Sequence, residues 1–199
     1  MSAQHPAFAE IIESSIVQAR GLCWTWSNLP HLGSLVKITQ SPFILYGCIE
    51  NIQTGSSDPL RQPFAYQKTE AELLQEQPQL FSFLQTTFTI KILGYRKGEA
   101  PFFYLLPPQP AKLHGFIEYV QPEECQAFFE NPEFLNLFFI PNEQGIDVDE
   151  LLLALLKHLQ ETIKIDASFI QRLCQYRASM QAIDYRGMKR FMQRLQHLL

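Results

Sequence analysis

The feature that most constrains the fold is the order of elements between residues 46 and 119. Two runs, 46–53 and 86–95, are rich in β-branched and aromatic residues and predict strands. The polar segment 54–63 and a short acidic helical pattern separate them, and a proline-rich corner leads to a further strand-like run at 113–119. This succession in so short a unit indicates a small closed β-barrel with a decorated loop.

Seven segments have the character of β-strands. We expect strands at 8–13, 15–26, 34–39, 43–53, 86–96, 101–106 and 113–120. Six or seven strands are enough to close a small barrel and remove its exposed edges. Gly47 is expected at a bulge or barrel corner. Residues 7–20 could instead form a helix, because their Ala, Glu and Ile residues fit one helical face.

Two capping patterns predict where helices begin. Thr69 and Glu72 have the spacing of a capping box, in which a hydroxyl and a carboxylate each bond a backbone amide. They predict a short helix within the insertion 54–84. Asp147 is a second candidate cap, because the leucines that follow it at 151–159 form a wide apolar stripe on a helix.

The period of the apolar residues changes from strand-like to helical at Pro122. We therefore predict an α+β protein with two parts. The first is a small closed β-barrel of six or seven strands over 7–121, which carries the insertion 54–84. The second is a helical extension over 122–199, and we expect it to pack on the barrel because its leucine stripe is costly to leave in water.

Composition fits a folded protein without a membrane segment. The chain has 199 residues, of which 46% are hydrophobic and 18% charged, unlike a disordered sequence. It shows no signal-peptide pattern near its start and no apolar run approaching the roughly 18 residues of a membrane span. The four cysteines have no zinc-type spacing, so we expect reduced core thiols. These features predict a soluble, cytoplasmic protein without a metal site.

The charge is unevenly distributed along the chain. The net charge is −4, but residues 1–165 carry a balance of −8 and residues 166–199 a balance of +4. A basic terminal helix could dock an acidic protein or a phosphate backbone. The candidate binding residues on this helix are Arg186, Lys189, Arg190 and Arg194. The alternative is a solvated face that the acidic barrel of the same molecule neutralises.

The polar segment 54–66 is the other candidate binding site, because loops on barrels commonly carry recognition. Its side chains offer hydrogen-bond donors, acceptors and a stacking ring, and the candidate residues are Ser56, Ser57, Asp58, Arg61 and Tyr66. A structural role is the alternative. Asp58 can bond the local backbone in an Asx turn while Arg61 pairs with an acid.

Catalytic motifs are absent from the sequence. There is no Gly-Lys-Ser/Thr of a P-loop and no dinucleotide-binding, zinc-protease or nucleophile-elbow pattern. His114, which follows a proline corner, is expected to be structural. Glu123 and Glu124 lie in the first turn of a predicted helix, where they complement the helix dipole. We therefore predict a protein that is not an enzyme and needs no cofactor.

Five short segments carry a resemblance to a known family. Three of them are Leu32-Gly-Ser-Leu-Val-Lys37, Gly47-Cys-Ile-Glu-Asn-Ile52 and Ser56-Ser-Asp-Pro59. The fourth is the predicted strand 86–95, which ends in Gly94-Tyr95, and the fifth is Pro107-Pro-Gln-Pro110, which precedes His114-Gly-Phe116. Their order and spacing are similar to those of the HAS-barrel family, named for the barrel shared by HerA-type DNA-pumping ATPases and the ATP-synthase catalytic head. The chain most resembles stand-alone cyanobacterial members without an assigned activity.

The resemblance implies a function without catalysis. In the ATPases the barrel is an accessory domain for ring assembly and partner docking, and the nucleotide site lies in a separate domain that this chain lacks. We therefore expect an interaction or assembly module that docks on a larger complex, for example a nucleic-acid-processing ATPase. The alternative is a small barrel that binds single-stranded nucleic acid through exposed aromatic residues. The acidic body opposes that alternative, and the basic terminal helix favours it.

Overall fold

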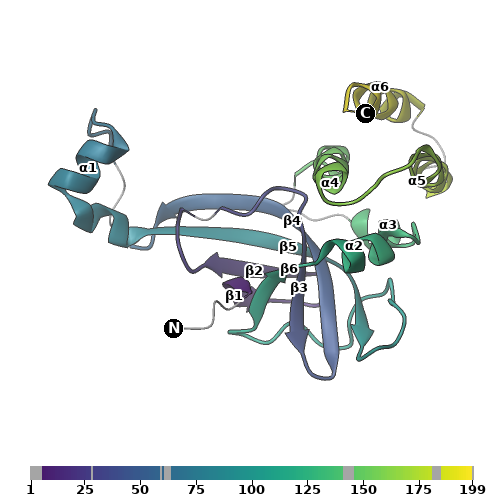
Figure 1. Ribbon diagram of the computed structural model, residues 1–199, viewed down its shortest axis with the longest axis horizontal. Helices are drawn as coiled ribbons and strands as arrows, with labels where there is room; N and C mark the ends of the chain where they lie inside the picture. Colours follow the sequence, from purple (N-terminus) through teal and green to yellow (C-terminus); the bar gives the residue numbers. More distant parts are fainter. Residues whose placement is uncertain are drawn as a thin grey trace.

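A computed structural model describes residues 6–27, 29–58, 60, 64–140, 146–180 and 185–198. Six antiparallel strands close into a barrel in the order β1-β2-β5-β4-β3-β6 (Figure 1). The strands are β1 (Ala7–Ser14), β2 (Gln18–Cys23), β3 (Leu35–Gln40), β4 (Phe43–Ser56), β5 (Leu84–Lys97) and β6 (Phe116–Tyr119). The predicted fold class, a small closed barrel followed by helices, is confirmed.

The helices lie in two places (Figure 1). Helix α1 (Glu70–Glu76) and the 3-10 helix η1 (Pro78–Phe83) connect β4 to β5. After β6 come five more helices, which are α2 (Pro122–Phe129), α3 (Phe134–Phe138), α4 (Val148–Thr162), α5 (Ala167–Met180) and α6 (Tyr185–Leu198). Over the part of the chain that the structure describes, no helix combines the length and apolar character that a bilayer crossing requires.

The strand predicted at 101–106 is wrong. In this segment only Phe103 forms a β-bridge, to Tyr95, with N–O distances of 2.9 and 2.8 Å. Pro101 and Pro107 bracket the segment and lack the amide hydrogen that a strand ladder requires. The helix considered for residues 7–20 is also wrong, because β1 and the start of β2 occupy them.

Gly47 lies at a register shift between β4 and β5, as the sequence predicts. A Cβ atom at this position would lie 2.4 Å from Ile90 Cγ2 and 2.7 Å from the carbonyl oxygen of Lys91. The two strands approach each other so closely that a side chain here would collide with β5. The glycine is therefore required by the close approach.

Two apolar cores meet at the barrel wall. The first fills the barrel interior and includes Ile11, Ile38, Ile49, Ile90 and Ile117. The second lies between the outer wall of the barrel and the helices, and combines strand residues such as Tyr46, Cys48 and Leu93 with phenylalanines of α2 and α3 and leucines of α4. The predicted leucine stripe is confirmed, since its members are at most 2% exposed: Leu151, Leu152, Leu155, Leu156 and Leu159.

Glu124 joins the first turn of α2 to the outside of the barrel. Its carboxylate accepts a hydrogen bond from Tyr46 at 2.5 Å and pairs with Lys37 at 2.8 Å and Arg96 at 2.9 Å. Burial alone raises the pKa of Glu124, but the hydrogen bonds from Lys37 and Tyr46 and the charge of Arg96 bring that pKa below its ordinary value. Helix-dipole complementation is therefore an incomplete explanation for Glu124.

Candidate functional site

Strands β4 and β5 extend beyond the barrel as a two-stranded arm. Each has 14 residues, longer than any other strand. The neighbouring strand β2 pairs with β5 only as far as Thr87, and β3 pairs with β4 only as far as Cys48. The outermost pairs, from Thr54–Thr86 to Ser56–Leu84, therefore join β4 and β5 alone. Figure 1 shows this arm projecting to one side of the molecule, with α1 at its far end.

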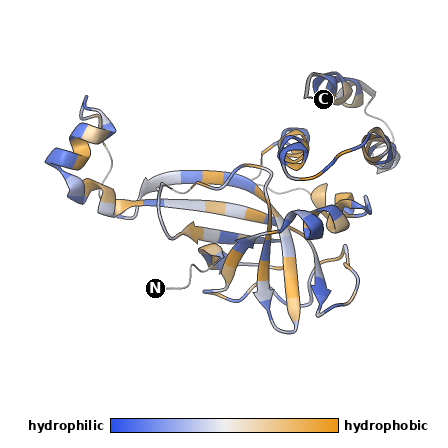
Figure 2. Ribbon diagram, in the orientation of Figure 1, coloured by the Kyte–Doolittle hydropathy of each residue, from blue (hydrophilic) through white to orange (hydrophobic). Residues whose placement is uncertain are grey.

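We call the described residues from 57 to 83 the arm tip. None of them is buried, and neither α1 nor η1 contains a buried residue. Three large apolar side chains are exposed to solvent: Leu60 (93%), Phe64 (67%) and Leu74 (48%). Figure 2 shows apolar positions among the hydrophilic ones on α1. The arm tip is thus an apolar surface displayed away from both cores.

Local hydrogen bonds organise the start of the arm tip. The Asp58 carboxylate accepts a bond from the Leu60 amide at 3.0 Å, so the Asx turn predicted for Asp58 is confirmed. The Ser56 hydroxyl accepts from the Asp58 amide at 3.1 Å, and the Ser57 amide donates to the Phe83 carbonyl at 2.7 Å. These polar groups therefore shape the turn from β4 into the arm tip.

The remaining loop candidates have different outcomes. The Tyr66 ring is half-buried and lies 4.1 Å from the Phe64 ring, centroid to centroid. Arg61 lies outside the described residues. The sequence analysis missed Leu60 and Phe64, although two isolated apolar residues within a polar, proline-containing loop were a readable signal.

The capping box predicted for α1 is confirmed. The Thr69 amide donates to the Glu72 carboxylate at 2.7 Å, and the Glu72 amide donates to the Thr69 hydroxyl at 3.3 Å. The bond from the Thr69 backbone, with that from its hydroxyl, lowers the pKa of Glu72. Lys68, which precedes α1, forms an ion pair with Glu76, the last residue of the helix. Local contacts thus hold α1 where no core supports it.

The arm tip is acidic over its described residues. In the sequence of residues 57–83, the four acids Asp58, Glu70, Glu72 and Glu76 outnumber the two bases Arg61 and Lys68. All three glutamates are exposed. A partner that covers the apolar side chains would therefore also meet negative charge, and basic groups around its binding surface would complement it.

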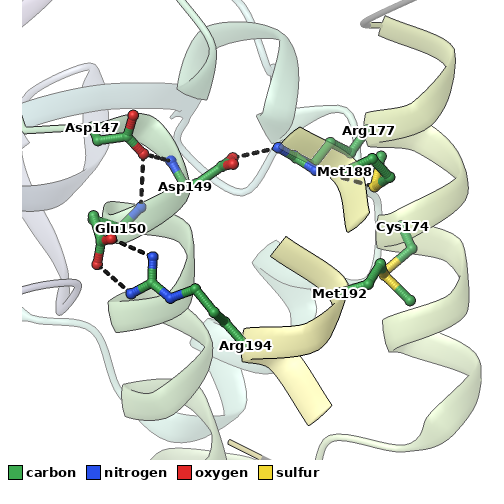
Figure 3. Close-up of polar contacts among 8 residues, drawn as sticks. All are labelled: Asp147, Asp149, Glu150, Cys174, Arg177, Met188, Met192 and Arg194. Carbon is green, nitrogen blue, oxygen red and sulfur yellow. Dashed lines mark hydrogen bonds and ion pairs between the residues drawn. The ribbon is translucent and has the colours of Figure 1, made fainter. Parts of the chain in front are cut away.

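The cations of the second candidate surface, the basic face of α6, lie in two different environments. Both guanidinium nitrogens of Arg194 bond the carboxylate of Glu150 in α4, the second at 2.6 Å (Figure 3). The hydrogen bond from Arg194 lowers the pKa of Glu150. Lys189 and Arg190 are exposed, while the Arg186 side chain lies outside the described part of the structure. Arg194 therefore binds within the molecule, but its partner belongs to a helix and not to the barrel that the alternative interpretation named.

Arg177 fixes α6 against α4 and α5, a role that the sequence analysis missed. Its side chain is 1% exposed, donates to Asp149 at 2.5 Å and lies over the Phe191 ring at 4.3 Å from the ring centre (Figure 3). A second guanidinium nitrogen lies 3.1 Å from the Met188 sulfur. This buried cation explains part of the basic character of residues 166–199 without an external partner.

No protein-family model and no curated protein matches this chain. Among the described residues there is also no group of three or more side chains suited to hold a metal ion. The arm tip combines projection, exposed apolar side chains and an absence of buried residues over its described positions.

Proposed function

We propose that this protein is a non-enzymatic interaction module that docks on a protein partner through its arm tip. The observation that carries the proposal is the exposure of Leu60, Phe64 and Leu74 on an element that projects from the barrel. Large apolar side chains grouped on a projecting surface are typical of protein interfaces, where a few such anchors supply most of the binding energy.

The lack of a core in the arm tip supports the same function. A seven-residue helix is marginal in water unless tertiary packing stabilises it, and α1 has no buried residue. A partner that covers Leu74 and Phe64 would supply that packing, at about 25 cal/mol per Å² of apolar surface removed from water. Binding would thus stabilise α1 and gain affinity from the same contacts.

The resemblance to the HAS-barrel family supports a larger assembly as the partner. A nucleic-acid-processing ATPase is the partner that this resemblance favours, because the related barrels serve as accessory docking domains. Because the arm tip is acidic, we expect the partner surface to carry basic groups around an apolar groove.

Site-specific photo-crosslinking tests the proposal. A benzophenone amino acid replaces Leu74 in the arm tip, and in a control protein it replaces Leu105, which is 61% exposed and lies outside the arm. We expect irradiation in native lysate to link a defined partner to position 74 and not to position 105. Phe64→Ala should reduce the yield at least about tenfold, because interface anchors dominate affinity. Equal crosslinking from both positions would contradict docking through the arm tip.

Single-stranded nucleic acid is a second candidate ligand, favoured by two exposed rings on the barrel. Trp24 and Phe116 are 45% and 41% exposed and lie 5.6 Å apart, edge to face. Bases can stack on such rings. Glu10, which accepts a hydrogen bond from the Trp24 indole, places negative charge beside them and opposes phosphate binding. Fluorescence anisotropy of a labelled oligothymidylate at low salt separates the two functions. A nucleic-acid binder should raise the anisotropy, and Trp24→Ala should reduce that rise.

A further inference from the structure

A polar pocket lies on the outer wall of the barrel, apart from the arm tip and α6. It has a volume of about 200 Å³ and forms where β1, β2, β5 and β4 lie side by side. Its polar walls include Glu13, Arg20, Asn51, Gln53, Thr87 and Thr89. Neither candidate surface described above contributes to this pocket.

Strand register brings four of these residues into one row. Glu13 pairs with Arg20, Arg20 with Thr89 and Thr89 with Asn51, so the row crosses all four strands. A register shift lies directly before Glu13 in β1, and another lies directly before Asn51 in β4. Bulges of this kind re-aim side chains and are enriched beside functional sites. Both outer members of the row thus follow an irregularity in their strand.

The charges in this pocket balance. Glu13 and Arg20 are direct partners across β1 and β2. The Arg20 guanidinium donates to the Thr87 hydroxyl at 3.3 Å, and Thr87 itself is 5% exposed. The guanidinium is therefore anchored at the pocket wall. A phosphorylated or polycarboxylate ligand would meet one cation together with one carboxylate, which is a poor electrostatic match.

The neutral groups suit a different ligand chemistry. The amides of Asn51 and Gln53 and the hydroxyl of Thr89 each both donate and accept hydrogen bonds. Adjacent hydroxyl groups on a ligand have the same dual character. The volume is smaller than the roughly 300–1,000 Å³ of pockets that hold drug-sized molecules. We propose that this pocket binds an uncharged, polyhydroxylated ligand of about the size of a monosaccharide.

Titration of the full chain by two-dimensional amide NMR tests the proposal. The probes are glucose, galactose and mannose, with glucose 6-phosphate and a short oligothymidylate as charged comparisons. We expect at least one neutral sugar to give saturable shifts at the amides of Arg20, Asn51 and Thr89, with a Kd in the millimolar range, about 1–10 mM. Glucose 6-phosphate should bind more weakly than glucose.

A double variant provides the second measurement. Asn51→Ala combined with Thr89→Val removes two neutral hydrogen-bonding groups and should weaken binding roughly tenfold. Gln85→Ala, a half-buried position on β5 outside the pocket, is the matched control and should leave the Kd unchanged. The proposal fails if no neutral sugar saturates, if the charged probes bind more tightly, or if the double variant binds like the control.

Discussion

At the scale of single residues, the half-buried Glu124 and the buried Arg177 hold the helices in place. Glu124 connects α2 to three strands of the barrel, and Arg177 connects α5 to α4 and α6. Each pairs with at least one opposite charge, so removal of either side chain leaves its partner without a counter-charge. Glu124 follows another acid, Glu123, and Arg177 is one of six bases in residues 166–199, so composition alone did not single them out.

Replacement of Glu124 tests the first of these anchors. Glu124→Gln keeps the shape of the side chain but removes the charge that Lys37 and Arg96 face. We expect a loss of about 2 kcal/mol in the free energy of unfolding at pH 7, since charged hydrogen bonds are lost at a partly buried site. Glu123→Gln, at the exposed neighbouring position of the same turn, is the control and should change little.

The same anchor predicts a pH dependence. The pKa of Glu124 is lower in the folded protein than its ordinary value of 4.5. The carboxylate therefore contributes its stabilisation above pH 4.5, and this contribution decreases as the pH falls from 4.5 through the folded-state pKa. Urea unfolding of the wild type and Glu124→Gln at several pH values should give curves that converge in acid. Parallel curves would show that this carboxylate does not titrate as described.

At the scale of elements, the cations of one face of α6 have different surroundings. Arg194 is paired with Glu150 in α4, whereas Lys189 and Arg190 are exposed. The sequence pattern places these cations on one face but cannot tell which of them meets an acid from another helix. That distinction depends on how α6 crosses α4, which is a non-local property of the fold.

Charge reversal separates an internal role of these cations from docking on a partner. Arg194→Glu should lower the Tm, because it sets two carboxylates against each other, and added salt should reduce the difference. Lys189→Glu with Arg190→Glu should leave the Tm unchanged. If α6 is a docking surface, this double variant also loses a partner that the wild type captures at low salt. A large Tm loss in the double variant would show that these two cations have an internal role instead.

At the scale of the whole molecule, sequence reasoning recovers what is locally encoded. The capping box at Thr69, the cap at Asp147 and the leucine stripe of α4 depend on residues within a few positions of one another. The projecting arm could not be predicted in this way, because it depends on β4 and β5 extending beyond the strands β3 and β2 that pair with them. The Glu124 anchor likewise joins Lys37 and Tyr46, which lie 87 and 78 residues away in sequence.

The shared core predicts the behaviour of a truncated protein. A fragment that ends at residue 121 would expose Leu35, Tyr46 and Leu93, which the helices cover in the intact molecule. We expect it to aggregate or to unfold at a much lower temperature than the full chain, because that apolar surface returns to water. Limited proteolysis that releases a soluble barrel as stable as the full chain would instead establish two independent folding units.

The middle of β4 has an apolar core on each of its faces. Leu45 and Ile49 face the barrel interior, Tyr46 and Cys48 face the helices, and all four have no exposed surface. Gly47, between them, admits no side chain. A strand with one solvated face accepts polar substitutions at every second position, but this stretch has no such position. Saturation mutagenesis should therefore find five consecutive intolerant sites here, and natural variation along this strand should be restricted to its two ends.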